Sequence, residues 1–203
     1  KNYSKFKFYE EKYKVECLNQ KITDNFGNGY DSLYGTRNMR TILFGVAYRG
    51  GANNFYHKES KRENQNPLPE DGLNNLLNQG FSAAVYLYAK NFDKTSKNYV
   101  NYSKKDTLHY MQFTGKDTKT LRKIMELVLE TINNPSKGPI YFHCWNGWHQ
   151  SGFISAAILM QFCSITNEQA LDYWIENTDG NNKGYENIKS LIKEFKPFDD
   201  FKI

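Results

Sequence analysis

The sequence predicts an α/β fold with a central, mostly parallel sheet of four or five strands flanked by helices. Short runs rich in apolar, β-branched and aromatic residues alternate with segments of helical apolar spacing from residue 41 to residue 195. The chain has 203 residues, 39% of them hydrophobic and 16% aromatic, which is enough to bury one core. We therefore expect one domain over residues 41–203, with residues 1–40 as an N-terminal extension packed on it by its aromatic side chains.

Three apolar runs in the first half of this domain are typical of buried strands, namely 41–48, 81–88 and 108–113. A helix is predicted between the first two. It opens at Pro69, which presets the backbone of a first helical turn, and stops at Gly80. Residues 52–68 and 90–106 are polar and rich in Lys and Asn, so we expect loops there.

The second half contains one predicted strand and four predicted helices. Apolar residues repeat at helical spacing over 119–133, and a short strand is expected at 139–143. The nearly continuous apolar segment after Gly152 predicts a buried central helix. Thr166 and Gln169 have the spacing of a capping box for the next helix, over 170–177. The last helix is expected over 185–195.

The composition excludes several classes of protein. The net charge is +5, but 22 Lys and 5 Arg are scattered among acidic residues, so we expect no nucleic-acid partner. No run approaches the roughly 20 apolar residues that a membrane-spanning helix needs. Three cysteines do not make a disulfide framework. The chain starts at Lys1 rather than Met, so we expect a preceding segment to have been removed, and both cytoplasmic and exported locations stay open.

The segment from Ile140 to Met160 carries the chemistry. A predicted strand runs into an eight-residue loop that leads directly into the apolar helix. Such a joint directs successive backbone N–H groups toward one point beside a helix N-terminus, which is a favourable place for an anion. Gly147 and Gly152 allow the close backbone approach that this needs. Cys144 stands at the start of the loop, where oriented N–H dipoles favour the thiolate, a nucleophile suited to attacking a bound phosphoryl group.

The spacing of five residues here resembles the signature loop of the cysteine-based protein tyrosine phosphatase superfamily: His143, Cys144, Gly147, Ser151 and Gly152. His149 and the segment Tyr48-Arg49-Gly50-Gly51 are similar to its atypical dual-specificity and tyrosine/serine branch. The resemblance implies a phosphatase-like sheet over roughly residues 41–195. We expect no cofactor, and no metal either, because His143, Cys144 and His149 lie on one tight loop without a second pair of ligands.

The resemblance implies that Cys144 is the nucleophile and that the loop holds a phosphoryl group or another oxyanion. The anion-binding residues would be Trp145, Asn146, Gly147, Trp148, His149, Gln150 and Ser151. Ser151 would donate to the Cys144 sulfur, or would act only as the N-cap of the helix. The partner would be a phosphorylated protein or a small-molecule phosphoester.

The sequence departs from the family pattern at Gln150, where the family has an arginine. An arginine makes a bidentate, charged contact with phosphoryl oxygens, whereas glutamine donates neutral hydrogen bonds. Losing such a contact costs roughly 10³–10⁵ in the rate of phosphoryl transfer. We therefore predict a phosphatase-like domain of impaired activity. The alternatives are a non-catalytic module that binds a phosphorylated partner and a thiol enzyme acting on another group. In the absence of the family arginine, His149 would supply a positive charge near the loop.

A general acid must protonate the leaving oxygen in this chemistry. Asp117 is the first candidate, with a helix N-cap as the competing interpretation, and Asp106 and Asp93 are the reserves. The remaining polar residues are expected to be structural. His143 should shape the loop by hydrogen bonding, and Arg49 should form an ion pair. We expect Cys17 and Cys163 to be small buried residues.

Overall fold

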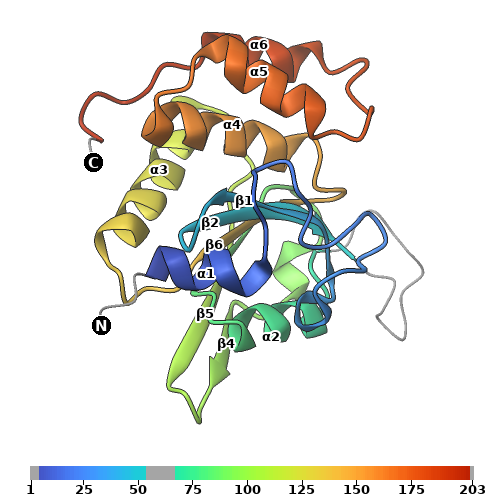
Figure 1. The fold of residues 1–203 in the computed structure, drawn as a ribbon, viewed down its shortest axis with the longest axis vertical. Helices are drawn as coiled ribbons and strands as arrows, with labels where there is room; N and C mark the ends of the chain where they lie inside the picture. Colours follow the sequence, from blue (N-terminus) through green and yellow to red (C-terminus); the bar gives the residue numbers. More distant parts are fainter. Residues whose placement is uncertain (1–4, 54–66, 202–203) are drawn as a thin grey trace.

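The computed structural model describes residues 5–53 and 67–201, and it forms one six-stranded sheet covered by helices (Figure 1). The strand order is β1-β2-β6-β3-β5-β4. The strands are β1 (Thr36–Leu43), β2 (Ala47–Ala52), β3 (Ala83–Tyr86), β4 (Asn98–Asn101), β5 (Asp106–Gln112) and β6 (Ile140–Cys144). The helices are α1 (Lys5–Tyr13), α2 (Glu70–Asn78), α3 (Thr118–Asn133), α4 (Gln150–Cys163), α5 (Asn167–Glu176) and α6 (Glu186–Glu194).

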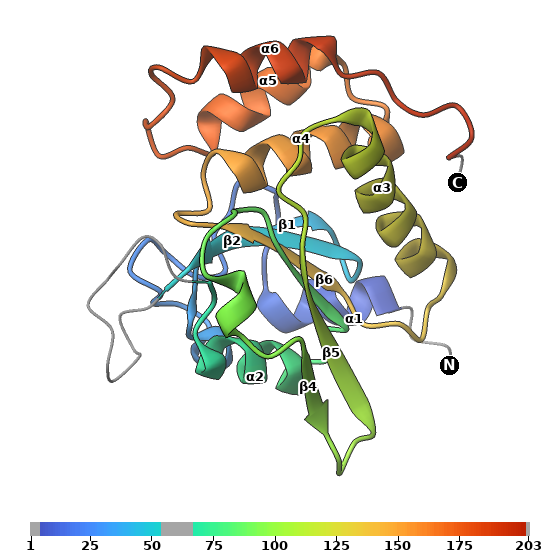
Figure 2. The same cartoon turned by 180° about the vertical axis from the view of Figure 1, so that it is seen from behind.

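The helices form two layers on opposite faces of the sheet, as Figures 1 and 2 show. Helices α1 and α2 share one hydrophobic core with one face, and α3 to α6 share a second core with the other. The strands supply both cores by alternation. In β6, Ile140 and Phe142 enter the α3–α6 core, whereas Tyr141 enters the α1–α2 core. The predicted α/β class with a mostly parallel central sheet is therefore confirmed.

The predicted strand over residues 41–48 is wrong in detail, because this run belongs to two antiparallel strands. Strand β1 pairs with β2, and the chain reverses between Leu43 and Ala47. Gly45 occupies the turn with φ +70°, a conformation that favours glycine. The run contains no polar break, so its apolar pattern concealed the turn. The hairpin also places the boundary expected after residue 40 inside β1.

Two further segments are more regular than expected. Residues 90–106, expected to be a loop, include β4, which pairs antiparallel with β5 at the sheet edge. The N-terminal segment contains helix α1, which buries Tyr9 and Tyr13. The other predicted helices and strands are found within a few residues of their expected bounds, and most of the loop expected over residues 52–68 lies outside the described residues. Among them, the capping box of Thr166 and Gln169 is complete. No helix in the described part of the chain is long and apolar enough to cross a membrane.

The sheet topology fixes the position of Cys144. Strands β2, β6, β3 and β5 run parallel, so their carboxyl ends meet along one edge of the sheet. Strand β6 lies between β2 and β3, and Cys144 is its last residue. The register brings Gly50 and Tyr86 level with His143 on either side. The segments that follow β2 and β3 therefore flank the loop after Cys144.

Candidate functional site

Cys144 lies at the base of the loop that joins β6 to α4. Its side chain is buried, with a relative exposure of 4%, and its Sγ atom is 3.4 Å from Ser151 Oγ. Ser151 is the second residue of α4, and the N-cap position belongs to His149. The N-cap interpretation of Ser151 is therefore wrong, and its hydroxyl is instead placed against the sulfur.

The carbonyl groups of the loop are turned outward and bound by the surrounding protein. Each of the five consecutive carbonyl oxygens from Trp145 to His149 accepts a hydrogen bond from a group outside the loop. The donors are, in order, Ala52 N (3.0 Å), Asn38 Nδ2 (2.7 Å), Arg49 Nη2 (2.5 Å to Gly147 and 3.3 Å to Trp148) and Trp174 Nε1 (3.1 Å). These donors belong to β1, β2 and α5. The protein thus holds the loop from its outer side.

The N–H groups of the same segment are left available. Among the described residues, no protein acceptor receives a hydrogen bond from the backbone N–H groups of residues 148–152. The last three of these groups belong to the first turn of α4, where helix geometry provides no internal acceptor. Free N–H groups and the positive end of the helix dipole together favour an anion.

Two glycines permit the close contact between this loop and β2. Gly147 has φ +79°, and a Cβ atom on it would lie 2.6 Å from the carbonyl carbon of Gly50. A Cβ atom on Gly51 would lie 2.5 Å from the carbonyl oxygen of Trp145. Any side chain at either position would push the loop away from the strand that binds its carbonyl groups.

Arg49 does not form the expected ion pair. Its side chain is fully buried behind the loop, and it donates to the carbonyls of Gly147, Trp148 and Asn177 and to the hydroxyl of Tyr173. Within the described residues it has no carboxylate within ion-pair distance. Arg49 was expected to follow a strand, but it lies inside β2, and its partners are three backbone carbonyls and the Tyr173 hydroxyl.

His143 has the structural role that was predicted. It is fully buried, with Nε2 2.9 Å from Tyr110 Oη and Nδ1 3.1 Å from the carbonyl oxygen of Cys144. Its ring also stacks on Tyr86 and Tyr141. Burial lowers the pKa of His143 to about 3, so the imidazole is neutral near pH 7.

His149 and Gln150 differ in what their side chains contact. The His149 ring stacks on Tyr185 at 3.6 Å, and its Nε2 lies 2.6 Å from the carbonyl oxygen of Asn181. Burial lowers the pKa of His149, and the positive charge of Arg49 lowers it further. The ring is thus committed to the segment before α6 rather than to the loop interior. Gln150 is partly exposed, and no hydrogen bond of its side chain is found among the described residues.

Asp117 is the N-cap of α3, as the competing interpretation predicted. Its carboxylate accepts from Thr120 N at 3.0 Å and from Thr120 Oγ1 at 2.8 Å. These hydrogen bonds lower the pKa of Asp117, so the group is ionised near neutral pH. Its chain neighbours Lys116 and Thr118 line a cavity with the C-terminal segment 194–200 and with none of residues 144–151. Its role as an acid stays a prediction.

The two reserve acids lie in different places. Asp106 is the first residue of β5, beside the β4–β5 turn (Figure 2). It therefore lies at the amino-terminal ends of the parallel strands, whereas Cys144 lies at their carboxyl ends. This position rules it out. Asp93 lies in the short 3-10 helix η3 (Phe92–Lys94) after β3. Tyr88, which lies between β3 and η3, stacks on Trp145 of the loop with ring centroids 5.5 Å apart, and the role of Asp93 as an acid stays a prediction.

Asp179 is a residue of this site that sequence reasoning missed. Its carboxylate accepts from Trp148 Nε1 at 3.0 Å and pairs with Lys21 at 2.7 Å and Arg40 at 3.1 Å. These contacts join the loop to the N-terminal segment and to β1. Nothing in the local sequence around residue 179 signals such a role, because its partners are distant along the chain.

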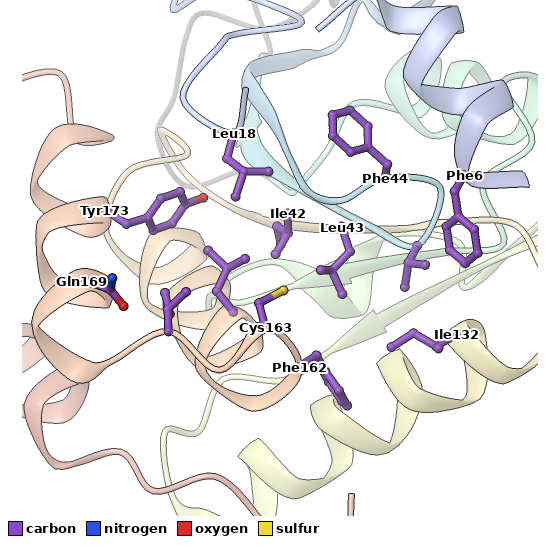
Figure 3. Close-up of a pocket in the computed structure, with 13 residues that line it drawn as sticks. Phe6, Leu18, Ile42, Leu43, Phe44, Ile132, Phe162, Cys163, Gln169 and Tyr173 are labelled. Carbon is purple, nitrogen blue, oxygen red and sulfur yellow. The ribbon is translucent and has the colours of Figure 1, made fainter. Parts of the chain in front are cut away.

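The other two cysteines were wrongly expected to be buried. Both Cys17 and Cys163 are exposed. Cys163 lines an apolar cavity of about 660 Å³, in which side chains from α1, the β1–β2 turn, α3, α4 and α5 converge (Figure 3). None of residues 144–151 lines this cavity, and its lining has no charged group. The phosphoryl chemistry predicted from the sequence therefore does not belong there.

Solved structures share this fold. The core catalytic domain of the PP-IP phosphatase SIW14 from S. cerevisiae matches with a TM-score of 0.51 and 16% identity, over 79% of this chain and 86% of that chain. TpbA from P. aeruginosa matches with a TM-score of 0.52 and 12% identity, over 78% and 85%. The chain has the fold of a phosphatase core. No family model and no curated protein matches the sequence.

No group of three or more His, Cys, Asp or Glu side chains in the described ranges could hold a metal ion. The groups that the structure places at the loop are a buried thiol, a hydroxyl beside it, and a row of backbone N–H groups. That set is suited to binding an oxyanion against the sulfur.

Proposed function

We propose that the loop from Cys144 to Ser151 binds a phosphoryl group or a similar oxyanion, as part of a cysteine-dependent phosphatase-like domain of impaired activity. The observation that carries this proposal is the orientation of the loop. Five consecutive carbonyls are bound from outside, while the N–H groups of residues 148–152 have no protein acceptor among the described residues. An anion is the partner that such a row of donors accepts.

In this proposal the thiolate of Cys144 attacks the phosphorus atom, and the bond from phosphorus to the leaving oxygen breaks. Water then hydrolyses the cysteinyl phosphate and regenerates the thiolate. The Ser151 hydroxyl, 3.4 Å from the sulfur, stabilises the thiolate when it leaves. The leaving oxygen needs a proton, and Asp117 can supply one only if it leaves its cap on Thr120 and first takes up a proton from solvent, because the capped carboxylate is ionised.

Gln150 is the reason to expect impaired turnover. It starts α4 at the place where the family arginine would stand, and its amide offers neutral donors. Charge on the phosphoryl oxygens in the transition state then receives less stabilisation than a guanidinium would give, a difference of roughly 10³–10⁵ in rate.

A binding module without turnover is the second candidate, and two observations favour it. Residue 150 carries no charge, and Asp117 is held as an ionised helix cap. The substrate or partner would be a phosphorylated protein or a small-molecule phosphoester. The yeast protein of the same fold is described as a PP-IP phosphatase and was solved in complex with citrate, also an anion.

The test is hydrolysis of para-nitrophenyl phosphate beside calorimetric binding of inorganic phosphate. We expect the chain to bind phosphate with slow turnover, Cys144→Ser to abolish turnover, and Gln150→Arg to raise kcat/KM by several orders of magnitude. Phosphate binding with no turnover in the folded Gln150→Arg protein would favour the binding module. A chain that binds no phosphate would exclude both candidates.

A further inference from the structure

The guanidinium of Arg49 lies directly behind the loop of residues 144–151, on the side opposite to the free N–H groups of that loop. Its Nη2 atom is 2.5 Å from the carbonyl oxygen of Gly147 and 3.3 Å from that of Trp148. Helix α4 is also close, because a Cβ atom on Gly152 would lie 3.4 Å from Nη2. A fully buried cation therefore touches the loop in its middle and at the beginning of the helix.

The charge of Arg49 is not neutralised by a neighbouring acid in the described part of the chain. Its hydrogen-bond partners are three carbonyls and the Tyr173 hydroxyl, and no ion pair includes it. Arg40, another buried arginine, is paired with Asp179 at 3.1 Å. Burial lowers the pKa of Arg40 and of His149, and the positive charge of Arg49 lowers both further.

The hydrogen bonds of Arg49 also act on the donors that would face an anion. The Gly147 carbonyl shares its peptide group with the N–H of Trp148, and the Trp148 carbonyl shares one with the N–H of His149. A cation bound to a carbonyl polarises the whole peptide group, which makes its N–H a stronger donor. Both of these N–H groups belong to the free set.

We propose that Arg49 supplies the fixed positive charge of the anion site in place of a charged residue at position 150. It acts from behind the loop, through the peptide groups that it binds, and it favours doubly charged oxyanions over singly charged ones. The inference rests on the proposed function, since it requires that the loop bind an anion. Arg49 is a positioning residue in this scheme, because it does not touch the anion itself.

The experiment compares sulfate with perchlorate, two tetrahedral oxyanions that differ in charge, by titration calorimetry at pH 7 and constant ionic strength. The variants are Arg49→Gln, a neutral donor, and Arg49→Lys, a charged donor. Arg122→Gln removes a guanidinium on α3 that is paired with Glu126 and Asp200, and it serves as the control. Thermal denaturation of each variant establishes that it is folded.

A fixed unit charge interacts twice as strongly with a dianion as with a monoanion. We therefore expect Arg49→Gln to reduce the preference for sulfate over perchlorate by about tenfold. Arg49→Lys should keep the preference while weakening both anions, and Arg122→Gln should keep it as well. An equal loss of both anions in Arg49→Gln would show a purely structural role and overturn the inference. A wild-type chain that binds neither anion would overturn the proposed function along with it.

A measurement on the unmodified chain covers the case in which Arg49→Gln does not fold. Iodoacetate is an anion and iodoacetamide is neutral, and both alkylate thiols. A positive site raises the rate ratio of iodoacetate to iodoacetamide, so we expect this ratio to be several-fold higher at Cys144 than at the exposed Cys163. A ratio at Cys144 no higher than at Cys163 would contradict a net positive charge at the loop.

Discussion

The neutral, buried His143 should make the stability of the protein depend on pH below neutrality. In the folded state its pKa is lowered from 6.5 to about 3, because burial removes water from the charged form. The bond of Nδ1 to the Cys144 carbonyl opposes this shift only in part. In the unfolded chain the imidazole is hydrated and titrates near its ordinary value.

Between these two values the unfolded chain binds a proton that the folded chain does not. Stability contributed by the neutral form is therefore present above about pH 6.5 and is lost as the pH falls toward 3. Between pH 7 and pH 5 the expected loss is about 2 kcal/mol in the free energy of unfolding. Burial also lowers the pKa of His149, which adds a change of the same sign.

Urea denaturation at pH 7 and pH 5 measures this loss, with His143→Gln as the variant that cannot take up the proton. The variant should be less stable than the wild type at pH 7, and the difference between them should shrink by about 2 kcal/mol at pH 5. His109→Gln, at an exposed position on β5, is the control. The difference in unfolding free energy between this variant and the wild type should be the same at pH 7 and at pH 5. Parallel pH dependence in the wild type and His143→Gln would refute the assignment of a neutral, buried imidazole.

Three further predictions concern the loop and the elements that hold it. Iodoacetamide should alkylate Cys144 faster than Cys163 at pH 7, because Cys144 lies at the base of a loop with free N–H groups, whereas desolvation beside the apolar cavity raises the pKa of Cys163; mass spectrometry measures both rates. In a Gln150→Arg background, Asp117→Asn keeps a side chain that can cap α3. A fall in kcat without a fall in the denaturation midpoint would identify Asp117 as an acid. An unchanged kcat would show that Asp117 acts as a cap alone. Gly152→Ala should destabilise the fold by about 1–3 kcal/mol in urea denaturation, because the new Cβ would lie 2.8 Å from the α5 indole. An unchanged midpoint would contradict that packing.

Helices and strands could be predicted from the sequence where one face is apolar and the bounds have local signals. The spacing of Leu121, Ile124, Met125 and Val128 predicted α3, and all four side chains are buried. The capping box at Thr166 marked the start of α5 correctly. The apolar run over 41–48 was misread, since only strand pairing decides that a chain reverses at Gly45.

The sequence by itself determined where the candidate site is, because the strand, the glycines and the apolar helix around Cys144 are contiguous in the chain and each has a local signal. Only the tertiary structure decided what holds the loop. Asn38, Arg49, Trp174 and Asp179 are far from it in sequence, and they reach it through the hairpin, α5 and the segment after α5. Asn38, Arg49 and Trp174 donate hydrogen bonds to backbone carbonyls of the loop, and Asp179 accepts one from the Trp148 indole. Such contacts leave no pattern in the types of side chain along the sequence. Within the described residues Arg49 has no acid at ion-pair distance, and this too is decided by the packing and not by the local sequence.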